Sequence, residues 1–377
     1  MSPLFAVLAV LHAYIGVRLL PDLGLGAAAI LPGAVLLAAS AYLIPHGFHA
    51  RRAAASRKGA RVAWTGLIAM GAFSTLFVLT LVRDVGLAVA LTVAALTPVA
   101  LPMAAIVRES AFAVPIVTVL VTAVGYLNAR RVAAVRRIDV PIDTLPRALH
   151  GFTIVQITDL HIGPTIGRDH VEAIVAAVNG LGADMVAITG DLVDGSVRQL
   201  TSHVEPLARL ASRHGTFFVT GNHEYYSGAH AWLGELRRLG LKVLMNEHVV
   251  VAHEGAELVV AGVTDHGAHH FDPAHRSDPA AAIAGAPEAA AKVLLAHQPR
   301  SAAAAAKAGF HLQLSGHTHG GQFLPWNWFV RLQQPFTAGL DRLDSLWVYT
   351  SRGTGYWGPP KRFGAPSEIT CLRLVAA

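Results

Sequence analysis

Two histidines separated by one residue are the first candidates for chemistry in this sequence. They lie in the stretch Ser315–Gln322, which reads Ser-Gly-His-Thr-His-Gly-Gly-Gln. Neutral imidazole is a favoured ligand for transition metals such as Zn, Fe and Ni, and glycine lets the backbone approach a bound group closely. If the stretch ends a strand, His317 and His319 should point to the same side. An isolated pair of this kind is more often a solvated loop, so a metal site needs further ligands.

Four other motifs supply carboxylate, amide and imidazole side chains where strands are expected to end. In chain order they are Asp159-Leu160-His161, Gly190-Asp191-Leu192-Val193-Asp194, Gly221-Asn222-His223-Glu224 and Ala296-His297-Gln298-Pro299. Strand ends are where α/β sheets build their sites, so these ligands should meet at one edge of one sheet. Mixed oxygen and nitrogen ligands without thiolate favour Mn, Fe or Zn. The single cysteine, Cys371, excludes an intramolecular disulfide and a Cys-based zinc site.

The segments that must position these motifs alternate between buried strands and amphipathic helices. Strands are predicted at residues 152–158, 185–189 and 216–220, with helices at 169–181, capped by Asp169, and 198–212. This alternation is typical of a layered α/β domain. The alanine-rich pieces 280–282 and 302–306 read as helices. After Leu241 a second sheet, packed on the first, is predicted from shorter strands at 248–252, 258–263, 293–296, 311–314, 346–350 and 369–374.

The beginning of the chain has a different character. Apolar runs at residues 3–20, 25–44, 62–82, 85–107 and 111–127 are each about long enough to cross a hydrocarbon core. Pro98 and Pro102 should kink the fourth. We therefore predict a multi-pass α-helical membrane domain of four or five helices at residues 1–129. A linker at residues 130–149, with room for a short edge strand, should connect it to a catalytic α/β domain at residues 150–377.

The charge distribution bears on partners and orientation. The formal net charge is +6, and the basic excess lies before residue 151, beside the apolar runs, which fits an anionic bilayer surface better than nucleic acid. One basic cluster lies at residues 51–61 and another at 130–137. Both cannot be cytoplasmic if three helices separate them. Because large domains cross membranes with little regard to charge, the sequence slightly favours an extracytoplasmic catalytic domain.

The ordered set of motifs resembles the calcineurin-like metallophosphoesterase superfamily over about residues 150–375. Within it, Gly316–Gln322 and the stretch Arg352-Gly353-Thr354-Gly355-Tyr356-Trp357-Gly358 resemble a bacterial membrane-associated branch. That branch includes phosphodiesterases and hydrolases of nucleoside-diphospho-lipids, and animal transmembrane proteins with a metallophosphoesterase domain have a similar layout. The resemblance implies an αββα sandwich, in which two β-sheets are flanked by helices.

The resemblance also implies roles for single residues. The first of two divalent metal ions (Mn, Fe or Zn) would be held by Asp159, His161, Asp191 and His319. The second would be held by Asp191, Asn222, His297 and His317. Asp191 would bridge the two ions, which lower the pKa of a bridging water so that hydroxide can attack phosphorus. His223 would protonate the leaving oxygen, while Asp194 and Glu224 orient ligands or cap loops.

The function that follows is hydrolysis of a phosphoester, free or lipid-linked, by a membrane-anchored dimetal enzyme. One alternative is a pyrophosphatase of a lipid-linked nucleotide, such as a UDP-diacylglucosamine-type substrate. Another is a catalytically silent membrane sensor or transporter-associated binding domain. No nucleic acid partner is expected. Two further groups have open roles: the histidines at 266, 269, 270 and 275 lie in a mobile loop or touch substrate, and residues 326–329 (Trp-Asn-Trp-Phe) form an interfacial lip or pack beneath the sheets.

Overall fold

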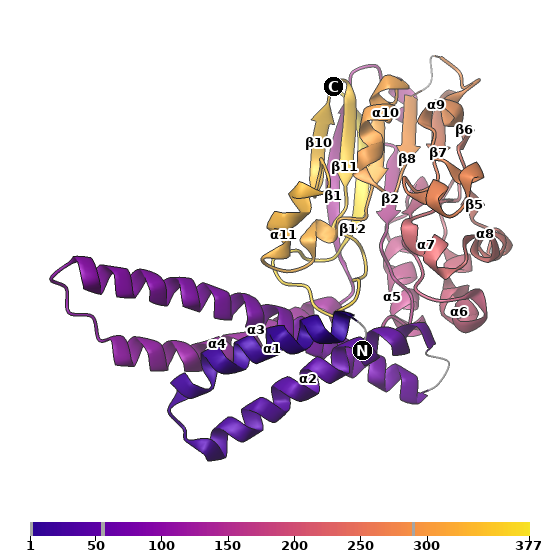
Figure 1. The fold of residues 1–377 in the computed structure, drawn as a ribbon. Helices are drawn as coiled ribbons and strands as arrows, with labels where there is room; N and C mark the ends of the chain where they lie inside the picture. Colours follow the sequence, from indigo (N-terminus) through magenta and orange to yellow (C-terminus); the bar gives the residue numbers. More distant parts are fainter. Residues whose placement is uncertain (1–2, 54–56, 289–290) are drawn as a thin grey trace. The chain divides into compact units, whose positions relative to one another are not determined.

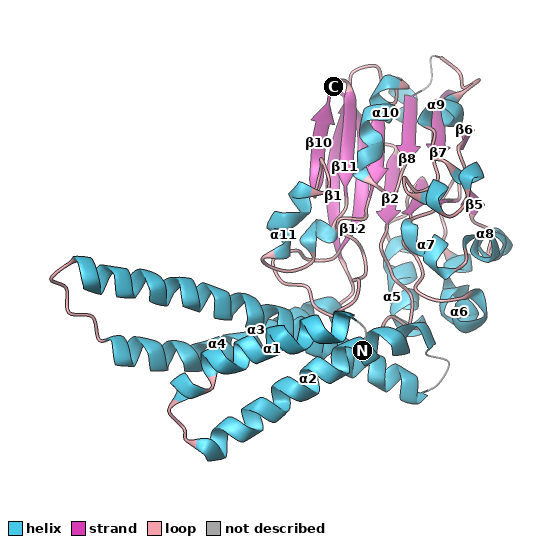
Figure 2. Cartoon of the chain, in the orientation of Figure 1, coloured by secondary structure: helices cyan, strands magenta, loops and turns pink. Residues whose placement is uncertain are grey.

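The chain forms two compact units. The computed structural model describes residues 3–53, 57–288 and 291–377 (Figures 1 and 2). The first unit is helical and comprises Met1–Leu127 with the short segment Gly358–Lys361; the second comprises Asn128–Trp357 and Arg362–Ala377. The two units are described separately below.

Within the described residues, four helices are long and apolar enough to cross a membrane. They are α1 (Pro3–Leu19), α2 (Ala27–Ala53), α3 (Arg57–Leu96) and α4 (Met103–Arg130). Many of their large apolar side chains are exposed, Val17 and Leu36 among them, as expected for surfaces that face lipid rather than water.

The described residues contain four such helices, not five, because two of the predicted apolar runs share one helix. The third apolar run and most of the fourth form the single helix α3, which continues through Arg83 and Asp84. The prediction that Pro98 and Pro102 kink a helix was wrong. Both lie in the non-helical connection between α3 and α4. Proline removes a backbone donor and clashes with the preceding turn, so Pro98 lies just after the end of α3, and Pro102 lies directly before the first residue of α4.

Charged groups inside the helical unit are paired with one another. The Arg83 guanidinium is almost completely buried and donates to Asp22 at 2.5 Å and to Ser110 at 2.9 Å. Arg83 also donates to two backbone carbonyls. The adjacent Asp84 accepts from Arg18 at 2.9 Å and from Tyr14 at 2.6 Å. Ionisable groups at membrane depth are costly unless paired, and these form one connected network.

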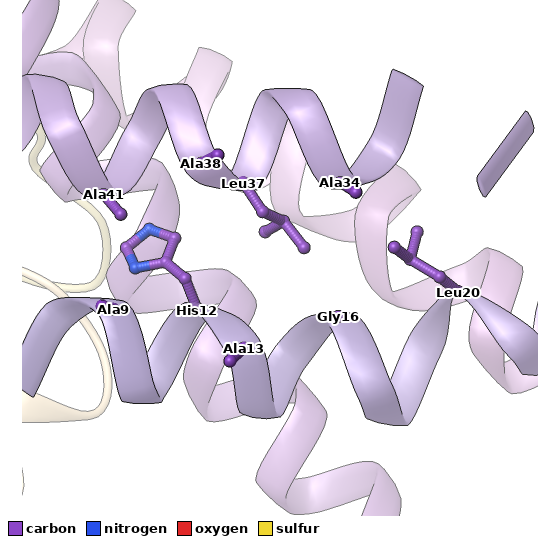
Figure 3. Close-up of a pocket in the computed structure, with 9 residues that line it drawn as sticks. All are labelled: Ala9, His12, Ala13, Gly16, Leu20, Ala34, Leu37, Ala38 and Ala41. Atoms are coloured by element: carbon purple, nitrogen blue, oxygen red, sulfur yellow. The ribbon is translucent and has the colours of Figure 1, made fainter. Parts of the chain in front are cut away.

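An apolar cavity lies between α1 and α2, and His12 is its most polar lining residue (Figure 3). The His12 ring lies 3.0 Å from the Ser40 hydroxyl and 2.7 Å from the Leu8 carbonyl, and stacks on Phe73. The remaining lining residues are alanine, glycine and leucine. Small side chains at these positions let the two helices approach closely.

The second unit contains two six-stranded mixed sheets. The first has the strand order β1 (Ala134–Ile142), β12 (Glu368–Ala376), β2 (Thr153–Ile157), β3 (Met185–Thr189), β4 (Thr216–Val219) and β5 (Lys242–Val243). The second has the order β10 (Gly339–Leu343), β11 (Leu346–Thr350), β9 (Leu312–Ser315), β8 (Ala291–Leu295), β7 (Ala256–Gly262) and β6 (Glu247–His253). The α-helices of this unit are α5 (Arg168–Asn179), α6 (Val197–Val204), α7 (Asn222–Ser227), α8 (Ala229–Arg238), α9 (Pro279–Ile283), α10 (Ala302–Lys307) and α11 (Trp326–Phe329).

Side-chain alternation along the strands explains the layering. In β2, Ile154 points into the core between the two sheets, whereas Val155 and Ile157 point into a separate core beneath α5, α6 and α8. In β8, Val293 and Leu295 join the inter-sheet core and Leu294 packs with α9 and α10. Successive strand residues face opposite sides, so strands that are apolar throughout must be covered on both faces. The predicted αββα sandwich is confirmed.

One strand of the first sheet differs from the sequence prediction, and an expected edge strand is longer and more buried than a linker implies. The strand near residue 370 does not join the second sheet; it returns as β12 and lies between β1 and β2 in the first. It pairs in parallel with β1 and antiparallel with β2. β1 itself lies in the segment predicted to be a linker, where it forms the edge of the sheet. Residues 134–142 are thus part of the α/β core, because Val140 and Ile142 are buried there.

Some helix boundaries also differ. Asp169 does not cap α5, because the helix begins at Arg168 with Gly167 at the N-cap. The helix predicted at residues 198–212 is shorter: α6 ends at Val204 and a 3₁₀ turn follows over Glu205–Arg209. Pro206 stands at the start of that turn, where its missing N–H prevents the α-helix from continuing. The alanine-rich helices are confirmed as α9 and α10.

Candidate metal centre

The predicted site residues follow strand ends in both sheets. Asp159, Asp191 and Asn222 come after β2, β3 and β4 of the first sheet. His297 and the His317/His319 pair come after β8 and β9 of the second. The prediction of one edge of one sheet was therefore wrong in detail: each sheet contributes half of the set. Within each sheet these strands are parallel neighbours, so their carboxyl ends lie at the same edge.

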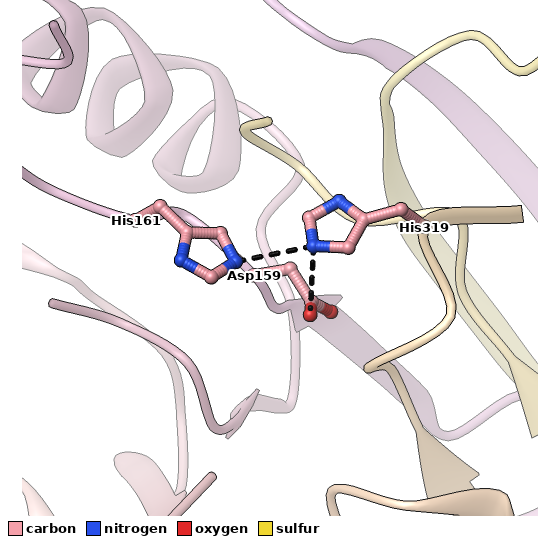
Figure 4. Close-up of side chains that lie close together, drawn as sticks. All are labelled: Asp159, His161 and His319. Carbon is pink, nitrogen blue, oxygen red and sulfur yellow. Dashed lines mark hydrogen bonds and ion pairs between the residues drawn. The ribbon is translucent and has the colours of Figure 1, made fainter. Parts of the chain in front are cut away.

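One group of ligand atoms is formed by Asp159, His161 and His319 (Figure 4). The two Nε2 atoms are 3.1 Å apart, and His319 Nε2 is 3.4 Å from Asp159 Oδ1. All three residues are buried. Two imidazole nitrogens and a carboxylate oxygen that converge away from water are a suitable set of ligands for a transition metal.

A second group is formed by Asp191, His297 and His317. His297 Nε2 is 3.2 Å from Asp191 Oδ2 and 3.2 Å from His317 Nδ1. The Nδ1 atom of His297 lies 2.8 Å from the Thr189 carbonyl, to which it donates, so its Nε2 lone pair is available. Asp191 Oδ2 is also 3.9 Å from His161 Nε2, and so this carboxylate stands between the two groups.

Asn222 supplies a direct test of whether the residues fit a bound metal. Its Oδ1 atom is buried and has no hydrogen-bond partner among the described residues. A buried carbonyl oxygen without a partner costs roughly 1–3 kcal/mol. Asn222 follows β4 and directly precedes His223, whose backbone N–H donates to Asp191 Oδ1 at 2.8 Å. The orphaned acceptor and the converging nitrogens both fit a divalent cation.

The backbone of the ligand loops is held in a rarely used conformation. Asp159, His161, Asp191, His317 and His319 all have φ between 50° and 70°. Such left-handed conformations cost of order 1 kcal/mol or more for residues other than glycine and cluster at functional sites. Two glycines permit the close approach of the loops: a Cβ on Gly316 would lie 2.2 Å from Asp159 Oδ2, and one on Gly221 would lie 2.2 Å from Asp191 Oδ1. The prediction that these glycines permit close approach is confirmed.

The H-x-H pair does not act as the end of a strand. β9 ends at Ser315, and the two histidines follow in a tight turn. Their rings therefore join different groups: His319 lies with Asp159 and His161, and His317 lies with Asp191 and His297. The prediction that both rings point to the same side by strand alternation was wrong. The turn lets two nearby residues serve two metal positions.

Asp194 links the candidate ligands to His223. Its carboxylate lies 3.1 Å from His161 Nδ1 and 2.5 Å from His223 Nδ1. Both imidazoles can donate Nδ1–H to this carboxylate, which places the lone pair of each neutral ring on Nε2. His223 Nε2 lies 4.0 Å from Asp191 Oδ2, so the ring faces the centre.

Glu224 is a loop cap rather than a ligand. It is fully buried and accepts hydrogen bonds from the backbone N–H groups of Asp191, Leu192 and Gly221 at 2.6–3.0 Å. Burial, followed by the nearby Asp191 charge, raises the pKa of Glu224 to about 7. The carboxyl thus ties the loop after β3 to the loop after β4, which brings Asp191 and Asn222 together.

Burial and close charges dominate the electrostatics of the ligand groups. Burial raises the pKa of Asp159 to about 6 and lowers that of His317 to about 3. It also lowers the pKa of His319, with a further contribution from Arg362. For His297, burial alone would lower the pKa, but the Asp191 carboxylate raises it well above its usual value. The lowered pKa values of His317 and His319 keep these two imidazoles neutral, so that their lone pairs are available, and the buried carboxylates supply negative charge; both features suit a cation.

Sequence reasoning did not find Arg362. This residue is buried and donates to the carbonyls of Arg352 at 2.7 Å and His319 at 3.0 Å, while its second terminal nitrogen lies 3.0 Å from His319 Nδ1. It therefore supports the backbone around one candidate ligand. Its only signal in the sequence is its position soon after the Arg352–Gly358 motif, since an arginine after Lys361 otherwise reads as a surface residue.

The surroundings of His223 include three aromatic rings. Tyr226 lies 5.2 Å and Trp357 6.1 Å from the His223 ring, between centroids, and Phe271 packs against Tyr226. All three are exposed. The short helix α11 carries Trp326, Trp328 and Phe329. Their side chains are exposed as well, so they do not pack beneath the sheets.

Comparisons with known proteins agree with this geometry. Residues 152–321 match the family model of the calcineurin-like phosphoesterases. An uncharacterized metallophosphoesterase of Aquifex aeolicus is 31% identical over 242 residues, which cover 64% of this chain and 91% of that protein. The chain belongs to the calcineurin-like metallophosphoesterase family. Its buried histidine and aspartate clusters are typical of a dimetal site in such enzymes.

Two relatives of this metallophosphoesterase match more of the chain. A bovine "transmembrane protein with metallophosphoesterase domain" is 42% identical over 279 residues, covering 71% of this chain and 62% of the relative. An uncharacterized metallophosphoesterase of Helicobacter pylori is 40% identical over 256 residues, covering 67% and 66%. The chain thus spans less than two thirds of the bovine protein.

Proposed function

We propose that the protein is a membrane-anchored phosphoester hydrolase that works with two divalent metal ions. The first would be held by Asp159, His161, Asp191 and His319, and the second by Asp191, Asn222, His297 and His317. The observation that carries the proposal is the convergence of two buried groups of ligand atoms on Asp191, with the unpartnered Asn222 oxygen beside them. A domain that only bound a ligand would not require this complete set.

The chemistry divides between the metals and the protein. When bound, the two cations supply an activated water and neutralise the phosphoryl oxygens. Asp191 has two oxygens and lies between the groups, so it holds both metal positions at a fixed separation. His161 and His223 are both oriented by Asp194, which sets their tautomers. When both ring nitrogens of His223 are protonated, Nε2 faces the centre and gives its proton to the departing oxygen.

The family and the helices support a phosphoester substrate presented at a bilayer surface. A catalytic domain joined to membrane helices meets a lipid-linked phosphate at a higher local concentration than a soluble one. The exposed aromatic rings at Trp326, Trp328 and Phe329 are of the kind favoured at membrane interfaces. Monoesters, diesters and lipid-linked pyrophosphates could all be hydrolysed by the same centre. The assay described below compares these three classes as substrates.

The four-helix count supports a cytoplasmic catalytic domain. Two helices, α3 and α4, separate the basic cluster at residues 51–61 from that at 130–137. An even number of crossings places both clusters on one side of the bilayer, and the positive-inside rule assigns that side to the cytoplasm. We propose this side instead of the extracytoplasmic side, which the sequence slightly favoured because large domains cross membranes with little regard to charge. Protease added to intact cells should leave the domain uncut, whereas protease added to inverted membrane vesicles should cut it.

The activity is tested with the purified full-length protein in detergent. Metal is removed with a chelator, Mn²⁺ is restored, and hydrolysis of aryl phosphate monoesters, diesters and lipid pyrophosphates is measured. We expect no turnover without metal and turnover of at least one class after Mn²⁺ is restored. Metal binding without turnover of any class would support the silent binding domain instead, and turnover retained in chelator would exclude the dimetal mechanism.

A further inference from the structure

A second cluster of metal-ligating side chains lies outside the dimetal centre. His230, Asp272 and His275 place one ligand atom each so that all three atoms are within 4.8 Å of one another. His230 Nε2 is 3.1 Å from Asp272 Oδ2, and His275 Nε2 is 3.8 Å from the same oxygen. His230 begins α8, whereas Asp272 and His275 belong to the 3₁₀ turn Pro273–His275 and its N-cap.

We infer that these three residues form an additional Zn²⁺ site, which fixes the segment Asp265–Arg276 against α7 and α8. The spacing supports this, because ligand atoms bound about 2.0–2.2 Å from a tetrahedral zinc stand roughly 3.3–3.6 Å apart. The two observed distances bracket that range, so small side-chain rotations would complete the geometry. Two imidazoles and one carboxylate, with water in the fourth position, are an established zinc ligand set.

Two of the three ligand atoms are left available by the surrounding hydrogen bonds. Asp272 Oδ1 accepts from the Ala274 N–H and caps the turn, so Oδ2 faces the two histidines. His275 Nδ1 lies 3.0 Å from the Tyr225 hydroxyl, which can accept its N–H and leave the Nε2 lone pair for a metal. A hydrogen bond at the second ring nitrogen is what orients most metal-ligating histidines.

The cluster is not explained by stability alone. The His230 side chain is 77% exposed and that of Asp272 is 28% exposed. An ion pair so open to water contributes little to folding. Two histidines directed at one carboxylate oxygen from separate elements are better explained by a ligand that both share.

The site would act on a segment that is linked to His223 through aromatic contacts. Tyr225 and Tyr226 both lie in α7, which also begins with Asn222 and His223, and their rings pack on Phe271 of the clamped segment. Zinc at His230, Asp272 and His275 would tie this segment to the start of α8. The site is separate from the dimetal centre, because it shares no ligand with it.

The test is the zinc stoichiometry of the full-length protein, expressed without a polyhistidine tag. After equilibration with Zn²⁺ and removal of free metal by gel filtration, we expect three zinc ions per chain for the wild type. His230→Ala and Asp272→Asn should each bind one ion fewer. The asparagine keeps an oxygen for the Ala274 N–H, and His230 is exposed, so neither change should unfold the domain.

His270→Ala is the matched control, because His270 is exposed in the same segment but outside the cluster. It should bind as much zinc as the wild type. Tyr225→Phe, which removes the supporting hydroxyl, should weaken the additional site roughly 10- to 100-fold without abolishing it. Limited proteolysis within residues 265–276 should be slower with Zn²⁺ in the wild type and unchanged by Zn²⁺ in His230→Ala.

A wild type that binds no more zinc than His230→Ala and Asp272→Asn would overturn the inference. So would an equal loss in His270→Ala. Asp191→Asn separates this result from the dimetal proposal: loss of metal from the centre should leave the His230-dependent zinc and its protection against proteolysis in place.

Discussion

Buried polar groups are arranged in opposite ways in the two units. In the helical unit the Arg83 guanidinium donates to Asp22, Ser110 and two carbonyls, so its charge and its donors are matched within the fold. In the α/β unit, imidazole nitrogens converge on carboxylate oxygens and Asn222 Oδ1 has no partner. A matched network stabilises the fold that contains it. Metal-coordinating oxygen and nitrogen atoms that converge without such matching are arranged for a ligand that comes from outside the fold.

The largest expected effect concerns where the α/β unit begins. A soluble fragment that starts at Asn128 should fold, whereas one that starts at Gly151 should not. The shorter fragment loses β1 and the buried side chains of Val140, Ile142, Leu145 and Leu149. At about 1.5–3 kcal/mol each, these contribute roughly 6–12 kcal/mol, comparable with the entire stability of a domain.

Solubility, circular dichroism and hydrolysis of a chromogenic phosphate ester would compare the two fragments. Equal solubility and activity would show that β1 is dispensable. Insolubility of both would show instead that the α/β unit depends on the helices.

The next effect concerns Asp191, at the meeting point of the two ligand groups. If Asp191 bridges two metals as proposed, Asp191→Asn should lower kcat/KM by roughly 10³–10⁵-fold, since the centre would lose a charge that contributes several kcal/mol. Metal content should fall as well. Asp184→Asn is the control, because Asp184 accepts hydrogen bonds from Thr153 in the same sheet but lies outside the ligand groups. Unchanged metal content in Asp191→Asn would contradict the bridging role.

His223 should affect turnover without affecting metal content. His223→Ala removes the proton donor held by Asp194, so kcat should fall roughly 10²–10⁴-fold. The loss should shrink for substrates whose leaving groups are acidic enough to depart without a proton. A series of aryl phosphates with leaving groups of different pKa provides the measurement. The same loss for every leaving group would rule against proton donation.

Arg83 tests the matched network of the helical unit. Arg83→Gln should lower the free energy of unfolding in detergent by roughly 1.5–3 kcal/mol, because hydrogen bonds to a charged group are lost. Metal content and activity on a soluble ester should stay the same. Arg108→Gln changes an exposed residue on α4 and should have little effect on the free energy of unfolding. Equal shifts for the two variants would mean that the network does not contribute specifically.

The smallest expected effect is at the exposed aromatic residues of α11. Trp326→Ala combined with Trp328→Ala should lower kcat/KM a few-fold for a lipid-linked phosphate in liposomes and leave that for a water-soluble phosphate unchanged. Because each exposed tryptophan buries only part of its apolar surface at an interface, the two together contribute only on the order of 1 kcal/mol. If the ratio of kcat/KM for the two substrates is unchanged, the aromatic residues do not contribute to delivery of the lipid-linked substrate.

Much of the fold could be predicted because the signals are local. The residues of β3 and the alanine-rich helices follow from apolar runs and propensity. The position of β12 in the first sheet could not, because a strand's alternation does not identify the strands on either side of it. β1 was expected only as a short edge strand within a linker, because Arg136, Arg137 and Asp139 interrupt its apolar pattern; an edge strand has only one neighbour and can keep such polar side chains.

The residues of the candidate site could be predicted, whereas its three-dimensional division could not. The five motifs that bring carboxylate, amide and imidazole groups together are visible in the sequence. The separation of His317 from His319 depends on two left-handed backbone conformations, and these depend on the close approach of Asp159 and Gly316. Arg362 was missed because its burial results from tertiary packing around His319.

The position of β12 also sets an order of events during synthesis. β1 follows directly on α4 and pairs in its sheet only with β12. The ribosome must therefore translate everything between Ile142 and Glu368 before β1 finds its partner, which takes roughly 10–50 s at about 5–20 residues per second. During that interval the membrane helices can insert and the second sheet can form. β1 and the edge of β2 that pairs with β12 have no strand partner until β12 is made. Nascent chains arrested before Glu368 should then expose this incomplete sheet to proteases and chaperones, and chains arrested well after Ala376 should not.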